Sequence, residues 1–284
     1  MKLKDILREY LSEEELKHAP STFDIIGSRE KAVAIVEIDP VLEDRKHLIA
    51  ESIMKIHKNV KTVLRKLSER KTAYRIREYE VLAGEEDTEV VHKEHGVRLK
   101  LDPRNVYFSP REATERLRIA RQVKPGETVM VMFAGVGPYA FIIARVQPLV
   151  EKIIAIELNP YAYKYLVENV RLNRVENKVI PVLGDVKIMA RKWYGECDRV
   201  VMPLPKGAYR FLDEAFQCLK KEGGVIHFYF WAKEESLFEN AIEHIWGYAW
   251  KYKRSVKILD IRKVLPYAPG VYKICVDFSV KNIY

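Results

Sequence analysis

Val-Met-Val-Met-Phe-Ala-Gly-Val-Gly, residues 129–137, is the stretch that decides the fold of this chain. An apolar run of strand length ends in a Gly-x-Gly turn, and Pro138 then opens a second apolar segment. A buried parallel strand that ends in such a turn before a helix is typical of sites for nucleotide-like ligands. Glycine allows the backbone to approach a ligand closely. The stretch therefore predicts a ligand site around Gly135 and Gly137.

Strands and helices alternate after this stretch. The sequence predicts strands at 152–156, 179–183, 198–202 and 225–231, helices at 161–172, 208–219 and 237–252, and a closing hairpin of 256–264 with 271–276. Such alternation predicts a doubly wound sheet with a mostly parallel core. A terminal antiparallel hairpin is the S-adenosylmethionine methyltransferase variant of that layout. We therefore expect the α/β class, with a Rossmann-like class I S-adenosylmethionine methyltransferase domain.

The first hundred residues predict a smaller N-terminal α+β domain. Helices are expected at 3–18 and 42–57, strands at 23–26, 32–38 and 60–67, and a small meander at 81–83, 89–92 and 97–101. Asp102-Pro103 is a plausible junction. We therefore expect one domain over residues 1–103 and the Rossmann-like domain over residues 104–284.

Composition limits the class of protein. The chain has 284 residues, of which 48% are hydrophobic, and no apolar run approaches the ~20 residues of a membrane span. Residues 1–14 are charged and amphipathic, so we expect no signal peptide and a cytoplasmic protein. The three cysteines form no metal-ligand pair, and no metal is expected. The net charge of +9 permits nucleic-acid binding, although a charge-rich surface of the heat-adapted kind is the alternative.

Carboxylates follow the second and third strands of the predicted sheet. Glu157 lies 20 residues after Gly137, the place and spacing of an acid that accepts hydrogen bonds from two ribose hydroxyls. The alternative is a strand end that faces solvent. Asp185 can accept from an exocyclic amine of the cofactor's base, and a helix cap is the compatible alternative. The predicted S-adenosylmethionine contacts in these loops are Phe133, Ala134, Gly135, Val136, Gly137, Glu157, Leu158, Asp185 and Val186.

The fourth strand ends in Pro203-Leu-Pro-Lys206. Two prolines one residue apart make a rigid, extended backbone, which can place carbonyls or a neighbouring side chain against a target base. A merely stiff loop is the alternative. Dinucleotide binding is less favoured, because the third glycine of Gly-x-Gly-x-x-Gly is replaced by Ala140.

Four motifs together resemble a known family. They are Tyr-Phe-Ser-Pro-Arg-Glu-Ala-Thr-Glu-Arg at 107–116, Met-Phe-Ala-Gly-Val-Gly-Pro at 132–138, Ile-Glu-Leu-Asn-Pro at 156–160 and Pro-Leu-Pro-Lys at 203–206. The combination resembles the archaeal and eukaryotic tRNA (guanine-37-N1)-methyltransferases. The wybutosine-pathway aminocarboxypropyl transferases share that fold and cofactor, and are close relatives.

The resemblance implies roles for several side chains. Glu115 is expected to be the general base that removes the guanine N1 proton. Arg75 is expected to contact guanine O6, with Arg77 as its competitor. Tyr107 and Pro203 are expected to flank the cofactor and the base. The residues that the resemblance assigns to the RNA substrate are Arg75, Arg77, Arg111 and Lys206.

The chemistry agrees independently with this assignment. Guanine N1 is a poor nucleophile until its proton leaves, so a carboxylate base and a cation near O6 meet both needs. The target base must also be flipped out of its stack. The alternative for Glu115 is an ion pair with an arginine of its own helix, and for Arg75 a solvated place in a charge run.

Two positions depart from the family pattern. Val131 stands where the family has aspartate, and Pro203 where it has asparagine. Three functions are therefore weighed: N1-methylation of guanosine 37 or a guanosine-derived precursor, aminocarboxypropyl transfer to a wybutosine-precursor base, and a non-catalytic cofactor-binding RNA module.

The expected partner is tRNA, bound through its anticodon stem-loop by a monomer. The N-terminal domain is expected to grip the loop with Arg70, Lys71, Arg75 and Arg77. The helix predicted at 111–122 is expected to contact phosphates through Arg111, Arg116 and Arg118.

Overall fold

The computed structural model describes residues 2–68 and 74–282, and these divide into two compact units. Unit 1 comprises Met1–Glu94 and Arg98–Pro110, and unit 2 comprises His95–Val97 and Arg111–Tyr284. Arg70 and Lys71 lie outside the described residues.

The N-terminal part of the chain is an α+β arrangement. Its helices are α1 (Leu3–Leu7), α2 (Glu13–His18), the 3-10 helix η1 (Pro40–Arg45) and α3 (Lys46–Ile56), and its strands are β1 (Asp24–Gly27), β2 (Ala32–Val36), β3 (Val60–Lys66), β4 (Tyr79–Gly84), β5 (Val90–Glu94) and β6 (Val97–Leu101). The first four strands form one sheet in the order β1-β2-β3-β4, in which only the β2 and β3 pair is parallel. Apolar side chains of α1, α3 and this sheet make one buried core.

Two predictions for this part are wrong. The helix expected at 3–18 is two helices, because Ser12 and Glu15 form a capping box that starts α2 anew. The expected three-stranded meander does not form, since β4 pairs with β3 in the four-stranded sheet and β5 pairs only with β6. Strand lengths alone cannot show this choice of partner, because pairing is decided by which apolar faces meet.

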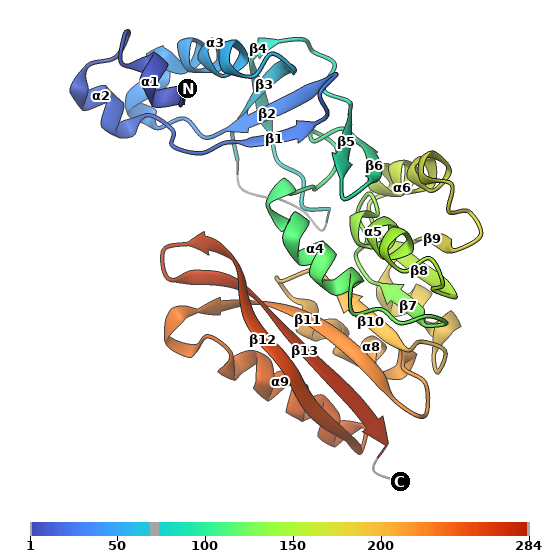
Figure 1. Ribbon diagram of the computed structural model, residues 1–284. Coiled ribbons are helices and arrows are strands. Elements are labelled where there is room, and N and C mark those ends of the chain that lie inside the picture. The colour runs from blue at the N-terminus through green and yellow to red at the C-terminus, as the bar shows by residue number, and fades with distance from the viewer. Residues whose placement is uncertain (1, 69–73, 283–284) are drawn as a thin grey trace. The chain divides into compact units, whose positions relative to one another are not determined.

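Unit 2 is a doubly wound α/β domain (Figure 1). Its helices are α4 (Ala113–Ala120), α5 (Pro138–Val146), α6 (Pro160–Asn173), α7 (Val186–Met189), α8 (Leu212–Cys218) and α9 (Glu239–Lys251), with 3-10 turns η2 (Pro110–Glu112), η3 (Ala190–Trp193), η4 (Ala208–Phe211) and η5 (Glu234–Ser236). Its strands are β7 (Thr128–Val131), β8 (Lys152–Glu157), β9 (Val179–Leu183), β10 (Arg199–Met202), β11 (Gly224–Lys233), β12 (Arg254–Ala268) and β13 (Val271–Asn282).

The seven-stranded sheet has the order β12-β13-β11-β10-β7-β8-β9. Strands β11, β10, β7, β8 and β9 run parallel, and β13 lies antiparallel between β11 and β12. All four residues of β7 are buried, as expected for a central parallel strand covered on both faces. Figure 1 shows α4 and α5 on one side of this sheet and α8 and α9 on the other. The predicted fold class is confirmed.

The closing hairpin is longer than predicted. Its strands pair from Arg254 with Asn282 to Ala268 with Val271, and β13 also pairs along the whole of β11. The prediction stopped at 276 because charged residues follow, but the ladder with β11 continues through them. The helix expected at 111–122 is shorter, since α4 begins at Ala113 after a 3-10 turn.

Among the described residues, every helix is too short or too polar to cross a lipid bilayer.

Candidate active site

The loop after β7 has an unusual backbone. Phe133, Gly135 and Gly137 have φ of 56°, 58° and 93°, in the left-handed region that a side chain disfavours. A Cβ atom on Gly137 would lie 2.3 Å from Phe141 Cε2 and 2.6 Å from Leu166 Cδ1. Glycine is therefore required at 137 by the packing of α5 and α6 as well as by its φ. A non-glycine residue at positive φ, such as Phe133, is a local strain of the kind that gathers at binding sites.

Glu157 ties this loop to the end of β8. The Gly135 N–H donates to its Oε2 at 2.7 Å, and the Asn159 N–H donates to its Oε1 at 2.7 Å. A carboxylate can accept about four hydrogen bonds, so it has the capacity to accept two ribose hydroxyls beside these amides. The side chain is partly exposed. This geometry fits the ribose diol of S-adenosylmethionine.

Asp185 caps the short helix α7, because its Oδ1 accepts from the Lys187 N–H at 2.8 Å. Asp185 is therefore the helix cap that the sequence offered as the compatible alternative. It still lies just after β9, where a contact with the cofactor's base is predicted. Val136 and Val186 are buried, at 0% and 3% exposure. Leu158 is exposed, at 39%.

The predicted cofactor residues of unit 2 gather at one edge of the sheet. Strand β7 pairs in parallel with β8 on one side and β10 on the other, with Val131 opposite Ala155 and Val201. The carboxyl ends of these strands therefore lie side by side, which is where open α/β sheets bind ligands. Half-buried Pro203 and exposed Lys206 follow β10 at the same edge.

Glu115 lies inside the domain, on the side of the sheet that α4 covers. It is 7% exposed, and Arg118 Nε and Nη2 donate to its Oε2 and Oε1 at 2.8 and 2.7 Å. The hydroxyl of Tyr229, on β11, donates to Oε1 at 2.6 Å. The ion pair with an arginine of the same helix is therefore formed. Arg118 is also shared with another anion.

That other anion is Asp277 of β13, which is 1% exposed. Arg118 Nη1 forms a very short ion pair with its Oδ2, and His227 Nδ1 lies 2.7 Å from its Oδ1. Burial opposes ionisation, but hydrogen bonds from His227 and Arg118 hold the pKa of Asp277 well below its ordinary value. Burial lowers the pKa of His227 despite its bond to Asp277, so this ring stays neutral. Burial is unfavourable to the charge of Arg118, yet the bonds to Glu115 and Asp277 raise its pKa.

Two of the expected phosphate contacts are wrong. Arg116 is 2% exposed, and the Arg118 side chain is 15% exposed and bound to Glu115 and Asp277. Arg118 faces Asp277 of β13, and Arg116 is buried within the domain. Arg111 is exposed and keeps its place as a candidate.

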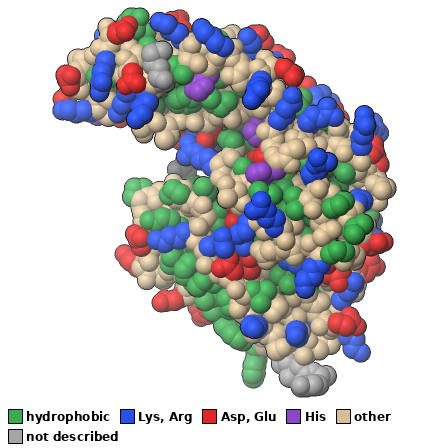
Figure 2. Space-filling view, viewed as in Figure 1, with side chains coloured by type: hydrophobic (Ala, Val, Ile, Leu, Met, Phe, Trp, Pro, Cys, Tyr) green, Lys and Arg blue, Asp and Glu red, His purple; other side chains and the backbone are tan. Residues whose placement is uncertain are grey.

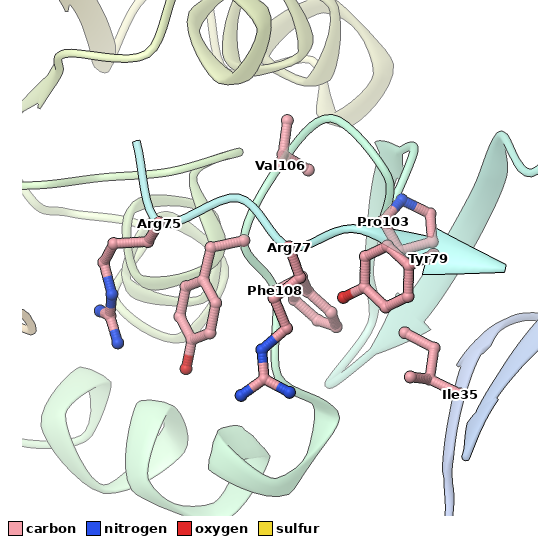
Figure 3. A pocket seen from close by; sticks show the side chains of 8 residues that line it. Ile35, Arg75, Arg77, Tyr79, Pro103, Val106 and Phe108 are labelled. Carbon is pink, nitrogen blue, oxygen red and sulfur yellow. The ribbon is translucent and has the colours of Figure 1, made fainter. Parts of the chain in front are cut away.

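Arg75, Arg77 and Tyr107 belong to unit 1, where they line one pocket. The Arg75 guanidinium lies over the Tyr107 ring, 4.5 Å from its centroid. Figure 3 shows Arg75 and Arg77 extending their side chains to the same side of the pocket. Arg77 Nε is buried and has no hydrogen-bond partner within the described part of the chain. The two arginines that the sequence left as competitors are therefore neighbours in one site.

The sequence analysis missed Tyr229, His227, Asp277 and Lys273. A signal existed, because His227 and Tyr229 alternate with apolar residues in one strand, and Lys273, Cys275 and Asp277 do so in another. Polar residues at every second position of a strand lie on one face of the sheet. When a neighbouring strand has the same pattern, the two sets of side chains can contact each other.

Comparisons with known proteins identify the family. A model of the "TRM5/TYW2 methyltransferase domain" matches residues 90–259, and a model of the "TYW2 N-terminal domain" matches residues 3–88. The chain belongs to the TRM5/TYW2 methyltransferase family. The recognised family and the enzyme class predicted from the motifs are thereby confirmed.

Members of the TRM5/TYW2 family from Pyrococcus resemble the whole chain. The tRNA (guanine(37)-N(1))-methyltransferase Trm5b of Pyrococcus abyssi is 44% identical over 261 residues, which are 92% of this chain and 75% of that protein. The tRNA(Phe) (4-demethylwyosine(37)-C(7)) aminocarboxypropyltransferase of Pyrococcus horikoshii is 35% identical over 281 residues, 98% of this chain and 96% of that protein.

Solved structures of the family have the same fold. Trm5b from P. abyssi superposes with a TM-score of 0.86 at 42% identity, covering 95% of this chain and 78% of that one. The complex of aTrm5 with tRNALeu gives 0.83 at 36% identity, with 98% and 78% covered. P. horikoshii TYW2 in complex with MeSAdo gives 0.81 at 34% identity, with 98% of each chain covered.

Proposed function

We propose that this protein is an S-adenosylmethionine-dependent methyltransferase that methylates N1 of guanosine 37, or of a guanosine-derived precursor, in tRNA. The observation that carries the proposal is the 44% identity to P. abyssi Trm5b across 92% of the chain, which includes Glu115 and the cofactor loops. The geometry of Glu157 and the turn after β7 supports the cofactor.

The proposed roles follow from chemistry. When bound, S-adenosylmethionine supplies an electrophilic methyl group. Glu115 accepts the N1 proton, and Arg75 stabilises the negative charge that develops at O6. Glu157 and Asp185 hold the cofactor together with the backbone at 133–137, Leu158 and Val186. Tyr107 and Pro203 flank the cofactor and the base.

We propose tRNA as the partner, bound through its anticodon stem-loop by a monomer in the cytoplasm. Arg75, Arg77, Arg111 and Lys206 are the proposed RNA contacts. On the face in Figure 2, Lys and Arg side chains lie among Asp and Glu side chains, so charge alone does not select them. The division into a tRNA-binding domain (1–103) and a catalytic domain (104–284) is part of the same proposal.

Aminocarboxypropyl transfer to a wybutosine-precursor base is the second candidate. The observation that favours it is the match of residues 3–88 to a TYW2 N-terminal domain.

Doubly labelled cofactor tests both candidates. S-adenosylmethionine carries one label in its methyl carbon and another in its carboxyl carbon, and tRNA transcripts either keep guanosine 37 or carry the tricyclic precursor. Methyl label on guanosine 37, located by nuclease digestion and mass spectrometry, is the expected result. Carboxyl label in the tRNA without methyl label would replace the first candidate with the second.

A further inference from the structure

The buried groups behind Glu115 carry an inference that rests on the proposed function. We propose that Asp277 and Tyr229 are positioning residues that set the basicity of Glu115 in opposite directions: Asp277 raises it by sharing Arg118, and Tyr229 lowers it by donating to Oε1. Neither residue is proposed to touch the substrate.

Sharing of Arg118 is visible in its contacts. Nε and Nη2 donate to the two oxygens of Glu115, while Nη1 and Nη2 also bond to Asp277, the latter at 3.2 Å. A guanidinium with two carboxylates divides its charge between them. Asp260 Oδ2 also lies 3.6 Å from Arg118 Nη1, but its side chain is 38% exposed. If Asp277 were neutral, Glu115 would therefore hold a larger share of the guanidinium charge, which favours the ionised carboxylate and weakens it as a base.

Asp277 is itself held in place. Gln122 Nε2 donates to its Oδ2 at 3.1 Å, the Cys275 thiol donates to its Oδ1 at 3.2 Å, and His227 Nδ1 lies 2.7 Å from the same oxygen. Burial raises the pKa of the Cys275 thiol, so that it remains a donor. Asp277 therefore keeps its charge and its orientation whenever Glu115 works.

Tyr229 links Glu115 to the helix that follows the cofactor loop. Its hydroxyl donates to Glu115 Oε1 and accepts from the hydroxyl of Tyr139, 3.2 Å away at the start of α5. Oε1 thus accepts from Arg118 and Tyr229, whereas Oε2 accepts only from Arg118 among the described residues. Oε2 is the oxygen that we assign to the guanine N1 proton.

Charged and titratable groups of each neighbouring element lie around Glu115 and its partners. They are Glu112, Arg116 and Arg118 on α4, Tyr139 on α5, His227 and Tyr229 on β11, Asp260 on β12, and Lys273, Cys275 and Asp277 on β13. Lys273 is bound to Glu112 at 2.8 Å, and its ammonium lies 4.7 Å from the centre of the Tyr229 ring. Asp277→Asn and Tyr229→Phe each alter a single one of these groups, so the effect of each variant can be assigned to that group.

The test is the pH dependence of single-turnover methyl transfer with saturating protein, cofactor and tRNA. Asp277→Asn should move the acid limb of the rate profile to lower pH by about one unit and lower the plateau. Tyr229→Phe should move the acid limb to higher pH, because a donor to the ionised form is lost. Cofactor affinity should change little in either variant. Damage that is only structural lowers the amplitude without moving the limb.

Asp213→Asn is the matched control. Asp213 lies on α8, on the other side of the sheet, and forms an ion pair with Lys251 that is more exposed than the one between Arg118 and Asp277. Its acid limb should coincide with that of the unmodified protein. Thermal unfolding identifies a variant that fails to fold. If Asp277→Asn does not fold, the inference is tested by the direction in which Tyr229→Phe moves the acid limb of the rate profile.

An acid limb that stays in place in the folded variants, or moves down in Tyr229→Phe, overturns the inference. Failure of the proposed function itself shows differently. The unmodified protein would then transfer no methyl group to guanosine 37, or Glu115→Gln would keep the full rate.

Discussion

Glu157 and Glu115 are both predicted site carboxylates, but the two regions hold them in different ways. Glu157 accepts hydrogen bonds from backbone amides of residues 135 and 159 at the edge of the sheet. Glu115 is buried, and within residues 2–68 and 74–282 it accepts from side chains alone, those of Arg118 and Tyr229. The first arrangement follows from a strand end and a turn. The second requires α4, β11 and β13 to meet.

The difference separates binding from chemistry. A carboxylate that backbone amides hold keeps its place even when neighbouring side chains change, which suits the recognition of an invariant ribose. A carboxylate held by ionised side chains has a basicity that those side chains tune, which suits proton removal.

The largest effect is expected at Glu115. Glu115→Gln should lower the single-turnover rate of methyl transfer by about 10²–10⁴-fold, because the general base is lost. S-adenosylmethionine affinity, measured by calorimetry, should be unchanged. Glu115 contacts Arg118 and Tyr229, which do not belong to the predicted cofactor loops. A normal rate would show that another group takes the proton.

Glu157→Ala should act on binding instead. We expect S-adenosylmethionine affinity to fall by about 10–100-fold, the range for losing hydrogen bonds to a charged group. Calorimetric titration measures the change. Glu157→Gln keeps one carbonyl oxygen, so its S-adenosylmethionine affinity should lie between that of the unmodified protein and that of Glu157→Ala. The contrast fails if saturating cofactor does not restore the single-turnover rate of the variant.

A smaller effect is expected from the stacked arginine of unit 1. Arg75→Lys keeps the charge but loses the planar guanidinium over Tyr107, so the rate should fall by about fivefold, which corresponds to about 1 kcal/mol. Arg29→Lys is the matched control, at an exposed position between β1 and β2 of the same unit, and should keep its rate. Single-turnover assays at constant salt measure both. Equal rates for the two variants would remove Arg75 from the site.

The smallest effect concerns a third carboxylate, Glu214, which is less fully hydrogen-bonded than Glu115. Glu214 of α8 is 8% exposed, its Oε2 has no hydrogen-bond partner among the described residues, and burial raises its pKa above 4.5. A raised pKa contributes stability below pH 4.5, and that contribution is lost as the pH rises through the folded-state value.

Glu214→Gln should therefore be more stable than the unmodified protein at pH 7 by about 1 kcal/mol, the lower end of the cost of an unsatisfied buried polar atom. The advantage should shrink toward pH 4. Denaturant unfolding at the two pH values measures it. A constant difference between them would mean that Glu214 does not titrate with folding.

Much of unit 2 could be predicted because its signals are local. A run such as residues 129–137 contains both the buried strand and the turn that ends it, and the spacing to Glu157 follows from one strand-helix-strand crossover. The division of unit 1 into two sheets could not be predicted. Whether β4 pairs with β3 or with β5 depends on which apolar faces pack together, and the strand sequences alone do not show this. The inward turn of Arg116 and Arg118 was missed for the same reason.

The sequence alone determined the α/β class, the family, and the loops at the carboxyl edge of the sheet, because these depend on residue types at short spacings. Only the tertiary structure decided that Glu115 shares Arg118 with Asp277, more than 150 residues away along the chain. It also decided that β11 turns His227 and Tyr229 to α4, and Ile226 and Phe228 to the core that includes α8 and α9. Burial and charge pairing depend on which faces meet, and that is a property of the whole fold.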